Sequence, residues 1–164
     1  MDKRLLFHGS PNKISGSYLL PSKAKDLGEK AENIHLGVYA TDERNMAIAM
    51  ALLKCKGVCA ASISFKKDAN GIIYVGWPEQ EHIYLYTLPV QKFRKTPPLK
   101  HQFVSFAPVR PIKEEKLRVA ACINVVRKAN REEMQKWFVK YGDRMLEDLK
   151  RLLKQIEEAK KSTK

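Results

Sequence analysis

The segment from Ile34 to Leu53 joins an extended stretch directly to an apolar run, and this junction limits the possible folds more than any other part of the sequence. Apolar residues alternate with others over positions 36–41, which is the period of two expected of a strand. Positions 46–53 are all apolar and are good helix formers, a pattern typical of a buried helix. We therefore predict a strand that leads at once into a core helix.

The residues at the junction suggest how the strand ends and the helix begins. Thr41 is predicted to be the helix N-cap, with Asp42 and Glu43 in the first turn near the positive end of the helix dipole. Tyr39 would then lie near the end of the strand, on the face opposite Val38. A tyrosine in this position is commonly a core residue, but it can also line the edge of a pocket.

Size and cysteine content favour a single domain in a reducing compartment. A chain of 164 residues with 44% hydrophobic residues can bury a core without covalent staples. Its three cysteines show no framework spacing, and the pair Cys55 and Cys59 has no second pair or nearby histidine. No disulfide and no structural metal site are predicted. No signal peptide or membrane span is expected either, so we expect a cytoplasmic protein.

The positive charge is concentrated in the second half of the chain. The formal net charge is +13, but residues 1–82 contain 11 Lys/Arg against 9 Asp/Glu, whereas residues 83–164 contain 20 against 9. Such a basic surface attracts phosphates, and aromatic residues are interleaved with it, as nucleic-acid binding requires. A solvated basic surface is the alternative. The candidate phosphate contacts are Lys92, Arg94, Lys95, Lys100 and Arg110.

Short apolar stretches predict several further strands before a long C-terminal helix. Strands are expected at 5–7, 58–65, 72–75, 82–86, 90–93, 103–106 and 119–126, with an Asn-Gly hairpin turn before the third of these. From Asn130, apolar residues recur at helical spacing, and Gly142 could split this helix into two. We predict an α+β fold, with residues 1–128 as the main domain and 129–164 as a helical extension packed on the domain or on a partner.

Three motifs occur in a fixed order along the chain. His8 lies in the sequence Phe-His-Gly-Ser, Tyr39 lies in Gly-Val-Tyr-Ala, and Glu81 begins Glu-His-Ile-Tyr-Leu-Tyr. Each residue has an ordinary structural explanation when it is taken alone. Together, the order and context of the motifs resemble the ADP-ribosyltransferases of the diphtheria-toxin and poly(ADP-ribose) polymerase type, over roughly residues 4–93.

The resemblance implies a fold, a substrate and a role for each motif. The fold would be two packed antiparallel sheets forming a cleft for NAD. His8 would bind the adenosine ribose, the Gly9 backbone would pair with the nicotinamide amide, and Tyr39 would stack on the nicotinamide ring. Glu81 would bind the 2′-hydroxyl of the nicotinamide ribose and act in catalysis. Ser10 and Gly37 complete the implied NAD-binding set.

The chain also departs from this family in ways that keep other functions open. Many polymerase members carry a serine and a second stacking tyrosine on the helix, where this chain has Ala47 and Met50. Glu79 is a minor candidate for contacting the acceptor. The chain is too short for a polymerase's regulatory helical domain, so mono-ADP-ribosylation of a protein or nucleic acid is the expected activity. The alternatives are an inactive nucleotide- or nucleic-acid-binding module and an RNA 2′-phosphotransferase.

Overall fold

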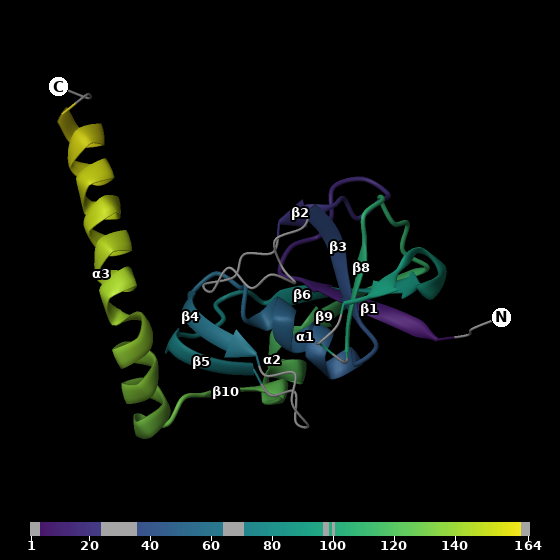
Figure 1. Ribbon diagram of the computed structural model, residues 1–164, viewed down its shortest axis with the longest axis horizontal. Helices are drawn as coiled ribbons and strands as arrows, with labels where there is room; N and C mark the ends of the chain where they lie inside the picture. The colour runs from purple at the N-terminus through teal and green to yellow at the C-terminus, as the bar shows by residue number, and fades with distance from the viewer. Residues whose placement is uncertain (1–3, 24–35, 64–70, 97–98, 100, 162–164) are drawn as a thin grey trace. The chain divides into compact units, whose positions relative to one another are not determined.

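The computed structural model describes residues 4–23, 36–63, 71–96, 99 and 101–161 (Figure 1). Contacts divide the chain into two compact units, Met1–Lys128 and Ala129–Lys164. The described part of the first unit forms two sheets, which are mostly antiparallel, and two short α-helices. The prediction of a mixed, largely antiparallel fold with few helices is confirmed. None of the helices in the described ranges is both long enough and apolar enough to cross a membrane.

The larger sheet has β1 (Leu5–Ser10) near its centre. On one side β1 pairs with β6 (His82–Pro89), in register from Leu5 opposite Pro89 to Ser10 opposite Tyr84. On the other side it neighbours β3 (Leu36–Thr41). The remaining members are β9 (Lys113–Arg118) beside β6, β8 (Gln102–Ser105) and β2 (Ser22–Lys23) beside β3, and β7 (Arg94–Lys95) beside β8.

The smaller sheet contains three strands. β4 (Val58–Ile63) and β5 (Gly71–Gly76) pair antiparallel, and β10 (Val126–Lys128) joins β5 in parallel. The residues of the predicted Asn-Gly turn before Gly71 lie outside the described residues. Through this sheet, the end of the first unit (residues 126–128) lies beside residues 71–73.

Apolar residues form separate cores on the two faces of the larger sheet. Leu85 of β6 packs with the buried helix α1 (Arg44–Leu52) and with Ile73 of the smaller sheet. Its neighbour Tyr86 belongs to a second cluster, which contains Leu6 and Val38. Since successive side chains of a strand point to opposite faces, α1 and the smaller sheet cover one face, and the second cluster lies on the other.

The helix α1 begins later than predicted. Its first residue is Arg44 and its N-cap is Glu43, so Thr41 is not the cap and Asp42 precedes the helix. Thr41 instead ends β3, and its buried hydroxyl accepts a hydrogen bond from the Glu43 N–H at 3.1 Å. Pairing with Gln102 of β8 keeps the Thr41 backbone extended. The Thr41 hydroxyl then fixes the turn between strand and helix through its bond with the Glu43 N–H.

Two predicted strands are wrong. Residues 90–93 contain the 3₁₀ turn η2 (Val90–Lys92), and residues 119–125 form α2 (Val119–Cys122) and the 3₁₀ turn η3 (Ile123–Val125). On the side away from β1, β6 pairs with β9, which was not predicted from the sequence. Most of its residues are charged, so its strand conformation depends on cross-strand pairing rather than on an apolar pattern.

The second unit is a single helix, α3 (Arg131–Lys161), which continues through Gly142 without a break. Its start is fixed by reciprocal hydrogen bonds between Asn130 and Glu133. The Glu133 N–H donates to Asn130 Oδ1 at 2.9 Å, and the Asn130 N–H donates to Glu133 Oε2 at 2.9 Å. This is a capping box, which satisfies two backbone donors at the helix N-terminus.

Gly9→Ala is predicted to destabilise the first unit by about 1–3 kcal/mol, because the added Cβ would collide with the backbone carbonyl of Ala47 in α1. Chemical denaturation monitored by near-UV circular dichroism measures the change. Gly142→Ala is the control, since a Cβ there meets no atom within 4 Å. Equal stability of the Gly9→Ala variant and the unmodified protein would contradict this packing.

Candidate functional site

The three motif residues lie on or beside three neighbouring strands. The strand order β3-β1-β6 places the strand of His8 between the strand of Tyr39 and the strand that Glu81 precedes. These residues are far apart in the sequence. Figure 1 shows the three strands as neighbours in the larger sheet, and the register places Tyr86 opposite His8, with Glu81 five residues before Tyr86.

His8 makes a direct contact with the backbone of Tyr39. The distance between His8 Nδ1 and the Tyr39 carbonyl oxygen is 2.7 Å. Because a carbonyl oxygen can only accept a hydrogen bond, Nδ1 carries the proton and donates it. In the neutral imidazole, Nε2 then holds a lone pair and can accept a hydrogen bond from a ligand hydroxyl.

The environment of His8 favours the neutral ring. Burial lowers the pKa of His8 from its ordinary value of 6.5, and the positive charge of Lys54 lowers it further. The hydrogen bond to the Tyr39 carbonyl acts in the opposite direction, but burial is the larger effect. His8 is therefore suited to orient a neutral ligand group rather than to bind an anion by charge.

The contact lies where the ladder between β1 and β3 ends. These strands are registered at Phe7 opposite Thr41, and the pairing does not continue along the described residues of β1 toward Ser10. In contrast, β1 is paired with β6 along its full length. The His8 side chain thus joins the two strands at the point where their backbones separate.

Tyr86 supports the opposite side of His8. The two residues are directly paired across β1 and β6, and their ring centroids are 6.5 Å apart with an interplanar angle of 42°. Tyr86 is fully buried, and its hydroxyl accepts a hydrogen bond from the Ile14 N–H at 2.9 Å. Burial raises the pKa of Tyr86. Sequence reasoning missed this role, although the spacing from Glu81 placed Tyr86 on the correct strand.

The Tyr39 side chain is half-buried, and burial raises its pKa. A Cβ added to Gly37 would lie 3.8 Å from the Tyr39 ring and would collide with Val104 Cγ2. Packing between β3 and β8 therefore already requires a glycine at position 37. The same holds at Gly9, where the backbone of Ala47 in α1 occupies the space that a side chain would need.

Ser10 forms the turn that follows β1. Its hydroxyl donates to the Asn12 carbonyl oxygen at 2.7 Å and accepts from the Asn12 N–H at 3.3 Å. These local bonds hold the backbone after the His-Gly-Ser motif in a defined conformation.

Glu81 lies just before β6 with an exposed side chain. Its side chain is 74% exposed, and its Oε2 is 3.8 Å from His82 Nδ1. The backbone is better fixed, because the Glu81 carbonyl oxygen accepts a hydrogen bond from the Val119 N–H at 2.8 Å. The contacts described for this carboxylate include neither His8 nor Tyr39. The structure therefore joins two of the three motif residues directly and leaves the third at the adjacent strand end.

Gln80 anchors the segment that carries Glu81. Its side-chain oxygen accepts a hydrogen bond from the Lys56 N–H at 2.8 Å, and its Nε2 donates to the Pro11 carbonyl oxygen at 2.8 Å. Pro11 directly follows β1, so this side chain ties the start of β6 to the end of the His8 strand. Sequence reasoning did not detect this link, because Gln80 and its two partners are far apart along the chain.

The predicted phosphate contacts are on the surface where the structure describes them. Lys92, Arg94, Lys95 and Arg110 are exposed, whereas Lys100 lies outside the described residues. The Lys95 ammonium lies 5.9 Å from the centroid of the Phe103 ring, a cation–π arrangement.

Comparison with known proteins identifies no relative of this chain. No protein-family model, no curated protein and no solved structure matches it.

The unfolding free energy should decrease more steeply below pH 6.5 in the unmodified protein than in His8→Gln. The unfolded chain takes up a proton at His8 as the pH falls through 6.5, whereas the folded chain, with its lowered pKa, does not. The slopes of unfolding free energy against pH should therefore differ between the two proteins by at most about 1.4 kcal/mol per pH unit, the value for one proton. Urea denaturation between pH 7.5 and 5 measures it, and parallel curves for the two proteins would disprove it.

Proposed function

We propose that this protein is an NAD-dependent mono-ADP-ribosyltransferase that releases nicotinamide and transfers ADP-ribose to a protein or nucleic-acid acceptor. The supporting observation is the strand order β3-β1-β6, in which the strands of the tyrosine and histidine motifs are neighbours and the strand that Glu81 precedes lies beside them. In the proposed site, NAD occupies a cleft where β1 and β3 separate.

His8 and Tyr39 would position the substrate. With Nδ1–H donated to the Tyr39 carbonyl, His8 Nε2 accepts a hydrogen bond from a hydroxyl of the adenosine ribose. The Tyr39 ring stacks on the nicotinamide, and the backbone of Gly9 pairs with its amide. Ser10 and Gly37 border this NAD site. The rigid link between His8 and Tyr39 would keep the two ends of NAD at a fixed spacing.

Glu81 would act on the bond that breaks. Nicotinamide leaves with the electron pair of the glycosidic bond, and the sugar develops positive charge at C1′. A carboxylate held at the 2′-hydroxyl stabilises that charge, an effect worth several kcal/mol when the group is preorganised. The acceptor nucleophile then bonds to C1′ as its proton passes to Glu81. The exposed side chain of Glu81 is free to turn toward bound substrate.

A binding module without catalysis is the second candidate. It is favoured by the contacts of Glu81, which reach His82 and not His8 or Tyr39 among the described residues. It is also favoured by Ala47, which is fully buried at the position where poly(ADP-ribose) polymerases often carry a serine. Such a module would bind a nucleotide or nucleic acid, and an RNA 2′-phosphotransferase would share the same basic surface.

Glu81→Gln should reduce nicotinamide release from NAD by at least about 100-fold while NAD binding is retained, because the charge is lost but the shape is kept. Glu79→Gln is the matched control, and it should retain release. Chromatographic quantification of nicotinamide, with NAD affinity measured by calorimetry, separates catalysis from binding. NAD binding with no release by the unmodified protein would favour the binding module.

Replacing Lys92, Arg94 and Lys95 with glutamine should weaken binding of single-stranded RNA and lower the slope of log affinity against log salt by about 2, at roughly 0.7 per phosphate contact. Fluorescence anisotropy at several salt concentrations measures both effects. Replacing the exposed Lys136, Lys140 and Lys150 with glutamine gives the same change in charge elsewhere. Equal losses in both variants would indicate general electrostatic attraction rather than a binding surface.

A further inference from the structure

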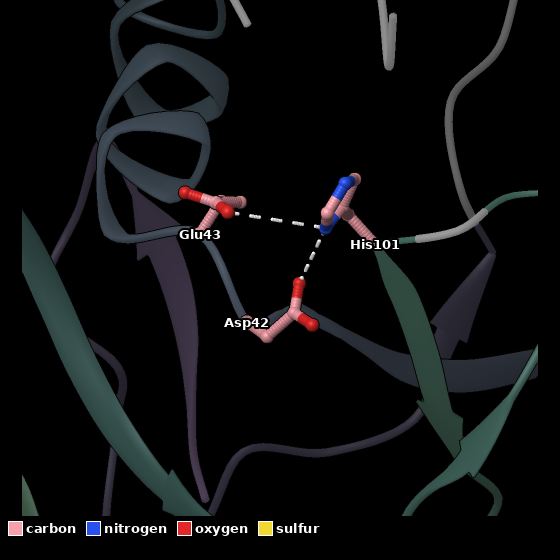
Figure 2. A group of neighbouring side chains, drawn as sticks. All are labelled: Asp42, Glu43 and His101. Atoms are coloured by element: carbon pink, nitrogen blue, oxygen red, sulfur yellow. Dashed lines mark hydrogen bonds and ion pairs between the residues drawn. The ribbon is translucent and has the colours of Figure 1, made fainter. Parts of the chain in front are cut away.

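Three side chains with metal-binding atoms converge beside the turn between β3 and α1. Asp42 and Glu43 come from this turn, and His101 directly precedes β8 (Figure 2). One ligand atom from each residue lies within 4.8 Å of the others. His101 Nδ1 is 2.8 Å from Asp42 Oδ1 and 4.0 Å from Glu43 Oε1.

The sheet holds these residues together. Thr41 pairs with Gln102 at the end of the β3–β8 ladder, so Asp42 and His101 are the next residues on each strand. The Thr96 N–H and hydroxyl both donate to the Gln102 carbonyl oxygen, at 3.2 Å and 3.1 Å. Backbone pairing therefore places His101 opposite Asp42.

The two carboxylates of this cluster have an imidazole as their basic neighbour. The chain contains 31 Lys/Arg residues, yet the ion pairs described for Asp42 and Glu43 are with His101. Two adjacent carboxylates beside an imidazole make a site with negative charge and three ligand atoms. A divalent cation would complete it.

The donor set selects a class of cation. An imidazole nitrogen with two carboxylate oxygens suits Zn²⁺ and similar transition metals, whereas Mg²⁺ and Ca²⁺ prefer oxygen ligands alone. Zinc–ligand bonds of about 2.0–2.1 Å in a tetrahedron separate the ligand atoms by about 3.3 Å. The spacing of His101 and Asp42 is close to this value, and Glu43, which is 56% exposed, has room to turn inward.

We propose that Asp42, Glu43 and His101 form a binding site for a zinc-like divalent cation, with a fourth position open to solvent. The site uses none of the residues assigned to NAD, so it is independent of the proposed transferase activity. A bound cation would replace the proton on His101 Nδ1 and would tie the start of β8 to the end of the strand that carries Tyr39.

The test is calorimetric titration of tag-free, chelator-treated protein with Zn²⁺, with Mg²⁺ titrated in parallel. Cys59→Ser serves as the background, because Cys59 is an exposed free thiol that could bind zinc elsewhere. We expect one Zn²⁺ per chain, no Mg²⁺ binding at the same concentrations, and at least about tenfold weaker Zn²⁺ affinity in both His101→Gln and Asp42→Asn. Zinc should also raise the melting temperature of the background protein but not of His101→Gln.

His82→Gln is the matched control, since His82 is also a partly exposed histidine beside a carboxylate, with Nδ1 3.8 Å from Glu81 Oε2. Its zinc affinity should equal that of the background. Circular dichroism verifies that each variant is folded before titration. Absence of zinc binding, or zinc affinity that is unchanged in folded His101→Gln, would overturn the proposal and leave the three residues as an ion-pair cluster.

Discussion

The close approach of β1 to α1 at Gly9 determines the arrangement of the first unit. The missing Cβ allows the Ala47 carbonyl to lie against the strand, so the helix covers one face of β1. Alternation along the strand then sends the neighbouring His8 to the opposite face, where Tyr86 and the second apolar cluster lie. Any side chain at position 9 would push the helix away and disturb both cores. One glycine thus fixes the orientation of the histidine.

Local patterns were sufficient to predict the elements that carry the motifs. The apolar stretches that became β1, β3 and β6 are short and bounded by polar residues, and α1 is apolar from Met46 to its end at Leu52. The nearness of His8 and Tyr39 was inferred from the resemblance of the motifs, not from periodicity. Their actual contact, between a side chain and a backbone carbonyl, depends on strand pairing that no local pattern encodes.

The features that could not be predicted arise from long-range pairing. β9 is mostly charged and forms a strand because β6 offers it a partner, whereas the apolar segment after it turns into a short helix as the Val119 N–H binds the Glu81 carbonyl. The Gln80 side chain bridges Lys56 and Pro11, and the Tyr86 hydroxyl holds Ile14. Each of these bonds joins residues far apart in the sequence, and the intrinsic secondary-structure propensity of a segment gives no information about such partners.

β1 is paired unequally with its two neighbours, so the larger sheet contains a weakly paired boundary between β1 and β3. β1 pairs with β6 along the whole length of β1, whereas β3, which pairs with β8, is registered with β1 at Phe7 opposite Thr41. A sheet built in this way opens most easily along that line, because few backbone hydrogen bonds must break there. Opening the sheet along this line must also break the hydrogen bond from His8 Nδ1 to the Tyr39 carbonyl oxygen.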